Sequence, residues 1–158
     1  MSEMETSIIA DSDHARDLAT GKSVTRLIEF LASTPIGWFS KRQSSVQSAT
    51  FGAECVALKR ATEEGAACRC YLRSFGAQAT NPTSICTDNM RALRNMTNPG
   101  VTLQKKQFAL ACHFCGEQCS ANVVGTRKTH AKSNLSDALT KSLDSKSHHN
   151  CFVPFIVN

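Results

Sequence analysis

The first part of the chain holds three short runs rich in apolar and β-branched residues, separated by polar and turn residues, which predict three antiparallel strands. The expected strands cover residues 6–10, 23–31 and 36–40, with a turn at 32–35 that includes Pro35. Asp11 directly follows the first of these strands. The pattern therefore predicts a meander with a carboxylate at the end of its first strand.

A long helix is predicted next, over residues 48–75. Apolar or small residues recur there at steps of three and four, as expected for one buried face: Phe51, Cys55, Leu58, Thr62, Gly65, Cys68, Leu72 and Phe75. Glu54 lies beside this face. A carboxylate in that position is either a surface residue or part of a site, because acids are rarely buried without a partner.

A short β-branched run at residues 83–87 ends in Asp88 and Asn89, and a helical pattern follows at once. Short polar side chains suit a helix N-terminus, where they accept the first free backbone N–H groups. The same junction lies at the carboxyl end of a strand, where open α/β sheets build their sites. Asp88 is therefore either a helix cap or a site residue, and other converging carboxylates would favour the second.

Further along, a helix is predicted over residues 104–119, a fifth strand over 123–129 and a last helix from Asn134. The apolar segment 151–157 has no predicted place. Cys112, Cys115 and Cys119 follow helical spacing, which favours core thiols over a zinc site because the chain has no second Cys-x-x-Cys pair. The fold class predicted from this order is α/β, a five-stranded mixed sheet of three antiparallel and two parallel strands, flanked by helices.

Composition and charge add little to the predicted fold class. A chain of 158 residues, with 41% hydrophobic and 20% charged residues, is expected to form a single domain over 1–158. Residues 1–5 are expected to be disordered, and 144–158 to form a tail. No apolar run is long enough to span a membrane, and the acidic N-terminus is unlike a secretory signal, so we expect an intracellular protein with reduced cysteines. The net charge of +5 is compatible with a polyanionic partner.

Five segments, in order, resemble the ribonuclease H domain of copia-type retrotransposon reverse transcriptases. Residues 10–17 (ADSDHARD) are similar to that family's SDADWAGD, and 35–43 (PIGWFSKRQ) to its PISWSSKKQ. Residues 48–58 (SATFGAECVAL) are similar to SSTEAEYMAL, 86–89 (CTDN) to YCDN, and 135–141 (LSDALTK) to LADILTK. The resemblance runs from about residue 8 to residue 143. It departs from the family where Gln107 replaces a histidine and where larger core residues have become Cys or Ala.

The resemblance implies a metal-binding set of four acids: Asp11, Glu54, Asp88 and Asp137. It implies two Mg²⁺ ions, with Mn²⁺ as a substitute, and hard carboxylate oxygens are suitable ligands for both. His130, in the loop before the last acid, is the candidate for proton transfer or product release, and a solvated loop histidine is the alternative. Ser12, Asn89, Lys41 and Arg42 are expected near nucleic acid, although the last two also fit an ordinary solvated strand end.

The implied function is hydrolysis of the RNA strand of RNA/DNA hybrids by a two-metal mechanism. The alternatives are a catalytically inactive, domesticated hybrid- or RNA-binding module on the same fold, and a nuclease of this fold that acts on DNA. The chain lacks the Tyr-x-Asp-Asp signature of a polymerase. We therefore expect either a domain of a longer polyprotein, with a reverse transcriptase polymerase as its partner, or a free-standing relative.

Overall fold

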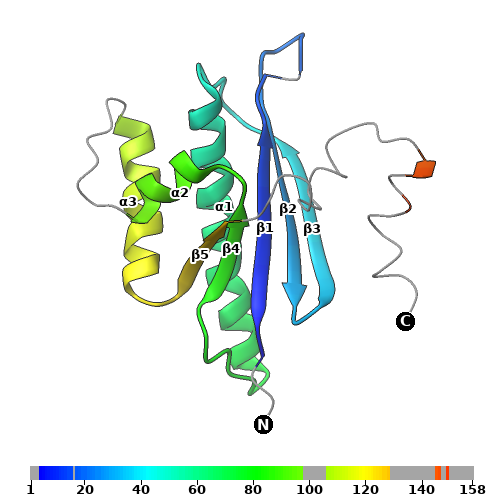
Figure 1. The fold of residues 1–158 in the computed structure, drawn as a ribbon, viewed down its shortest axis with the longest axis vertical. Coiled ribbons are helices and arrows are strands. Elements are labelled where there is room, and N and C mark those ends of the chain that lie inside the picture. The colour runs from blue at the N-terminus through cyan, green and yellow to red at the C-terminus, as the bar shows by residue number, and fades with distance from the viewer. Residues whose placement is uncertain (1–3, 16, 98–105, 129–144, 147–148, 150–158) are drawn as a thin grey trace.

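The sheet has five strands in the order β3-β2-β1-β4-β5 (Figure 1). The computed structural model describes residues 4–15, 17–97, 106–128, 145–146 and 149. β1 pairs antiparallel with β2, and β2 with β3, whereas β1 pairs parallel with β4, and β4 with β5. The elements are β1 (Thr6–Asp13), β2 (Val24–Leu31), β3 (Thr34–Arg42), α1 (Thr50–Ser74), β4 (Thr83–Thr87), α2 (Met90–Thr97), α3 (Lys106–Ser120) and β5 (Val124–Lys128). The predicted fold class is confirmed.

The core lies between the sheet and the helices that pack on it. α1 contacts β1, β2 and β4, and α3 packs against α1 and α2. The most deeply buried apolar side chains come from both layers: Ile8, Ala10, Leu27, Leu58, Ala61, Ile85, Ala92, Cys115 and Val124. Burial of these side chains is the main favourable term for the fold. Among the described residues, no helix is both long and apolar enough to cross a bilayer.

Close contact between α1 and α3 depends on a small residue. A Cβ atom added at Gly52 would lie 2.5 Å from Cζ of Phe108. Phe108 also packs edge-on against Phe51, with ring centroids 6.1 Å apart. The buried thiols Cys55 and Cys112 complete this contact with Phe108. Cys112 and Cys115 are buried, which confirms their interpretation as core residues, whereas Cys119 is only partly buried.

Three details differ from the sequence-based expectations. Asp11 lies inside β1, which continues to Asp13, so it does not end the strand. Glu54 is part of the buried face of α1 and does not lie beside it. Phe75, predicted on that face, is 85% exposed. The buried positions of α1 stop at Gly65, so the apolar spacing continues past the part of the helix that is buried.

Several predictions concern residues outside the described part of the chain. These are Asp137, His130, residues 1–3, the helix expected from Asn134 and the segment 151–157.

Candidate active site

Strand register brings Asp11 and Asp88 to the same level of the sheet. In the parallel pair of β1 and β4, Ile9 lies opposite Cys86. Two residues further along each strand are Asp11 and Asp88, the latter one residue past the end of β4. Neighbouring strands lie about 4.8 Å apart. The two carboxylates therefore belong to one end of the sheet, although they are far apart in sequence.

Glu54 reaches the same place from above the sheet. It is the fifth residue of α1, and Figure 1 shows this helix beginning at the end of the sheet where β1 finishes. The Glu54 side chain is 5% exposed. Its pKa is raised from 4.5 to about 8, first by burial and then by the negative charges of Asp11 and, to a smaller extent, Asp88. The three carboxylates are thus close enough to repel one another.

The hydroxyl group of Ser12 partly offsets this repulsion. Its proximity lowers the pKa of Glu54, against the larger effects of burial and of Asp11. Among the described residues, however, the hydroxyl has no hydrogen-bond partner of good geometry, and neither does Oε2 of Glu54. A buried carboxylate oxygen without a donor is costly. The cluster is therefore short of positive charge at Glu54.

A hard divalent cation fits this donor set, because carboxylate oxygens are its preferred ligands. It would also satisfy the unpartnered Oε2 of Glu54 and remove the repulsion among the acids. Within the described residues, no three His, Cys, Asp or Glu side chains surround one point tightly enough to form a ready-made ion site. Asp11, Glu54 and Asp88 therefore share an electrostatic environment without being drawn together around a common centre.

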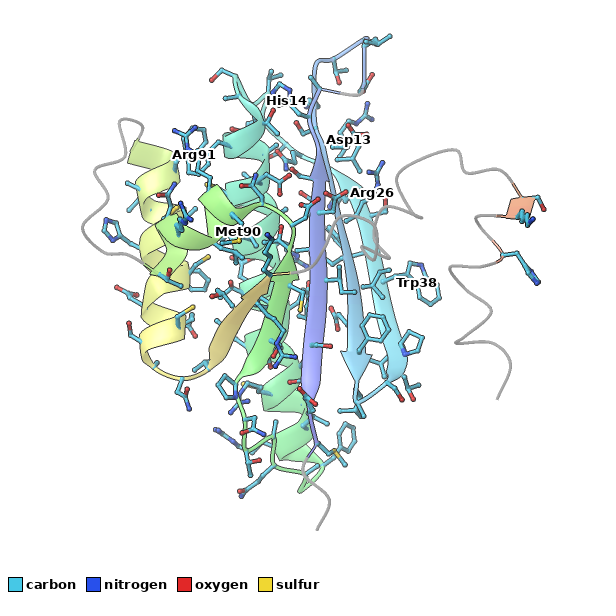
Figure 2. The ribbon with its side chains drawn as sticks, viewed as in Figure 1. Asp13, His14, Arg26, Trp38, Met90 and Arg91 are labelled. Atoms are coloured by element: carbon cyan, nitrogen blue, oxygen red, sulfur yellow. The ribbon has the colours of Figure 1, made fainter. Side chains whose placement is uncertain are left out.

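Arg26 supplies a fixed positive charge beside these acids, and sequence reasoning missed it. It lies directly opposite Asp11 in the antiparallel pair of β1 and β2, so the two side chains leave the sheet on the same face. Its guanidinium lies 3.8 Å from Oδ2 of Asp13, and the residue is 5% exposed. Figure 2 shows Arg26, Asp13 and His14 at the end of β1. The sequence feature that could have indicated Arg26 was a single arginine inside the otherwise largely apolar strand Val24–Leu31.

Replacing Arg26 with Leu should destabilise the metal-free protein by roughly 1–3 kcal/mol, because it removes the cation that is paired with Asp13 at a partly buried site. The loss should shrink when Mg²⁺ is added, since a bound cation replaces part of the missing charge. Thermal denaturation with EDTA and with Mg²⁺ measures both effects. An Arg26→Leu protein as stable as wild type in EDTA would show that the pair is energetically unimportant.

The candidate nucleic-acid residues occupy the same end of the sheet. Asn89 caps α2, since its Oδ1 accepts a hydrogen bond from the Ala92 N–H at 3.0 Å. Lys41 and Arg42 pair with the start of β2, which in turn pairs with the end of β1. Both are exposed, and Arg42 forms an ion pair with Asp17 at 2.5 Å. Ser12 is buried next to Glu54, so it does not form part of an exposed surface.

Two further features of this end were not foreseen. Nε2 of His14 lies 3.0 Å from the backbone oxygen of Gln47, which ties the loop after β1 to the approach to α1. The guanidinium of Arg91 lies over the ring of Phe51, 5.4 Å from its centroid. A cation held over an aromatic face is partly fixed in position. Arg91 thereby adds a positive charge near the first turn of α1.

Two curated transposon polyproteins are similar to this chain in sequence. The retrovirus-related Pol polyprotein from transposon RE2 of Arabidopsis thaliana is 28% identical over 141 residues, which cover 89% of this chain and 10% of that protein. The corresponding polyprotein from transposon RE1 gives the same identity and coverage. The chain thus spans about a tenth of the length of these curated relatives. No protein-family model matches the sequence.

Comparison with solved structures identifies the fold of this chain. LC11-RNase H1, isolated from compost, superimposes with a TM-score of 0.65 at 14% identity, covering 85% of this chain and 91% of that one. The foamy viral protease-reverse transcriptase in complex with an RNA/DNA hybrid gives a TM-score of 0.62 at 12% identity, covering 94% of this chain and 20% of that one.

The chain has the ribonuclease H fold. Its sequence relatives are retrovirus-related Pol polyproteins of transposons, which confirms the resemblance to a retrotransposon ribonuclease H domain.

Proposed function

We propose that this protein is a metal-dependent ribonuclease H that hydrolyses the RNA strand of RNA/DNA hybrids. The observation that carries the proposal is the shared electrostatic environment of Asp11, Glu54 and Asp88, which raises the pKa of Glu54. Support comes from relatives with the same fold, since LC11-RNase H1 has been solved in complex with an RNA/DNA hybrid, at a TM-score of 0.60.

In the proposed mechanism, Asp11, Glu54 and Asp88 hold Mg²⁺ or Mn²⁺, and Asp137 completes the set. When bound, the metal supplies Lewis-acid stabilisation of the scissile phosphate and a more acidic water nucleophile. The chain's own contribution is placement: the β1–β4 register aligns Asp11 with Asp88, and α1 brings Glu54 over them. Hydrolysis would leave a 5′-phosphate on the product, and His130 would transfer a proton near neutral pH.

Substrate would be held mainly through its backbone, because hybrids are recognised by shape, phosphates and 2′-hydroxyls. Lys41 and Arg42 at the end of β3 are proposed to contact phosphates. The amide nitrogen of Asn89 is available for a sugar or phosphate contact, because only its oxygen is used in capping α2. A reverse transcriptase polymerase within a longer intracellular polyprotein is the proposed partner of the domain.

The direct test compares a labelled RNA/DNA hybrid with duplex RNA and duplex DNA, each with Mg²⁺, Mn²⁺ or EDTA. We expect metal-dependent cleavage of the RNA strand of the hybrid alone. Cleavage of duplex DNA instead would point to a DNA nuclease on this fold. A folded protein that cleaves none of the three with either metal would refute the enzyme proposal.

One observation favours the alternative of a non-catalytic hybrid-binding module. The described acids do not surround a common point, and Arg26 already places a cation opposite Asp11. Such a module would bind the hybrid with an affinity that is insensitive to EDTA and would leave it uncut. The same experiment, read by gel shift beside cleavage, therefore separates the two functions.

A further inference from the structure

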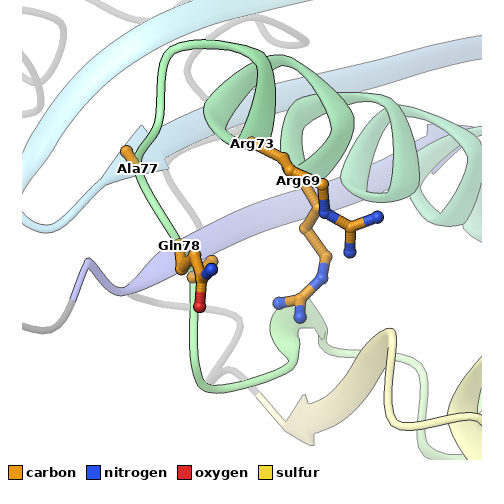
Figure 3. Close-up of a pocket in the computed structure, with 5 residues that line it drawn as sticks. Arg69, Arg73, Ala77 and Gln78 are labelled. Atoms are coloured by element: carbon orange, nitrogen blue, oxygen red, sulfur yellow. The ribbon is translucent and has the colours of Figure 1, made fainter.

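A polar cleft lies at the opposite end of α1 from the candidate active site. Its volume is about 320 Å³, and its lining residues are Arg69, Arg73, Ala77, Gln78 and Ala79. Figure 3 shows the two arginines on the last turns of α1 and Ala77 and Gln78 on the chain that turns back beside them. Arg69 is fifteen residues beyond Glu54, about 22 Å along a helix axis, so the cleft is separate from the acid cluster.

The cleft carries two positive charges that no acid compensates. Within the described part of the chain, neither Arg69 nor Arg73 has a carboxylate within ion-pair distance, and no acid lines the cleft. The two arginines are four positions apart on one helix face, an arrangement in which like charges repel. The helix dipole favours Arg73 in the last turn, but its effect fades before Arg69.

Other cations on the same helix are paired, which makes this pair distinctive. Lys59 lies 3.3 Å from Glu63, and Arg60 forms ion pairs with Glu63 and Glu64. Those contacts neutralise the middle of α1. The uncompensated charge of the helix is thus concentrated at its C-terminal cleft.

The cleft is also built in a defined shape. Gly76 has a φ of +74°, and the Gly76 and Ala77 N–H groups donate to the carbonyl oxygens of Arg73 and Leu72. This is the glycine-terminated helix end that turns the chain back on itself. Arg69 then donates from its guanidinium to the backbone oxygen of Asn81 at 2.5 Å, which holds the guanidinium toward the returning chain.

We propose that this cleft binds a phosphate group, taken either from a nucleic-acid backbone or from a free phosphate anion. Guanidinium groups match phosphate oxygens with paired N–H donors, and two of them in one cleft can hold a single phosphate from two sides. The Gln78 amide offers a further donor from the returning chain. The site would give the domain a second anchor for a polyanion, remote from its acids.

The test uses the intact protein and two probes: inorganic phosphate, read by thermal shift, and an uncleaved RNA/DNA hybrid in EDTA, read by fluorescence anisotropy. Arg69→Ala/Arg73→Ala is compared with Lys59→Ala/Arg60→Ala, which removes the same charge from paired positions of the same helix. We expect the first variant alone to lose a phosphate-dependent rise in Tm of about 3 °C, or to bind the hybrid about tenfold more weakly. For a backbone phosphate, the slope of log affinity against log salt should also fall by about 1 to 2.

Arg73→Ala alone leaves the Arg69–Asn81 hydrogen bond intact, so it tests the cleft without disturbing the returning chain. This variant should bind phosphate or the hybrid about threefold more weakly, or worse. If the arginine variants lose only the phosphate-dependent rise in Tm, the ligand is a free anion. If they bind the hybrid more weakly, the ligand is a nucleic-acid backbone. If the two double variants behave alike with both probes, the inference is wrong. Neither probe requires cleavage, so an inactive protein would refute the proposed function and leave this test intact.

Discussion

Replacing Asp88 with Asn should reduce cleavage of an RNA/DNA hybrid by about a thousandfold or more, with hybrid affinity changed by less than about threefold. The substitution keeps the size of the side chain and removes its charge. Asp88 is half-buried one residue past the end of β4, so a side chain of the same size fits there. A neutral amide there would hold a divalent cation much more weakly than a carboxylate, whereas the proposed contacts to the hybrid backbone come from other residues.

Single-turnover cleavage and anisotropy in EDTA measure the two quantities separately. Glu117→Gln is the matched control, because it removes an exposed carboxylate from α3 without touching the acid cluster. An Asp88→Asn protein that keeps near wild-type cleavage would remove Asp88 from the proposed site. A large loss of hybrid binding in the same variant would assign Asp88 to substrate recognition instead.

Replacing Glu54 with Gln should stabilise the metal-free protein at pH 8 and have little effect near pH 5. The pKa of Glu54 is about 8 in the folded protein, against 4.5 ordinarily. Between these values the folded state holds a proton that the unfolded state has released, so stability falls as pH rises through this window. At about 1.4 kcal/mol per pKa unit, the loss by pH 8 is a few kcal/mol. Glutamine is neutral at every pH in this range, so the Glu54→Gln protein does not lose this stability.

Urea denaturation in EDTA at pH 5, 6.5 and 8 measures this dependence. Glu63→Gln on the same helix is the control, because Glu63 is more exposed and ion-paired with Lys59. Mg²⁺ should restore the stability of the wild type at pH 8 and leave Glu54→Gln unchanged, since the cation favours the ionised carboxylate. Equal pH dependence of wild type and Glu54→Gln in EDTA would show that Glu54 is ionised at neutral pH and would contradict the crowded carboxylate cluster.

Local patterns determined most of the elements. Short β-branched runs, turn residues and helical spacing are local features of the sequence, so the meander, α1 and the β4–α2 junction were all predictable. The capping role of Asn89 is equally local, because its oxygen bonds an N–H three residues ahead. The order of motifs also named Asp11, Glu54 and Asp88 as site residues before any of them had a position in space.

Tertiary structure decided how those residues act on one another. The register between β1 and β4 places Asp11 and Asp88 at the same height in the sheet. The packing of α1 on the sheet buries Glu54 beside them. A helical spacing pattern cannot report burial, which is why Glu54 was expected beside the buried face and Phe75 within it. Burial and nearby charge together produce the raised pKa, and neither is a property of the glutamate itself.

The same holds for the positive charges. Arg26 and Asp11 are fifteen positions apart in sequence and become neighbours through the antiparallel pairing of β1 with β2. Arg69 and Arg73 form a cleft because the chain returns past them at Gly76, whereas Lys59 and Arg60 on the same helix are neutralised by their neighbours. The sequence by itself determined which charged groups this protein has. The tertiary structure decided which of them are compensated, because compensation depends on distances that only the folded chain sets.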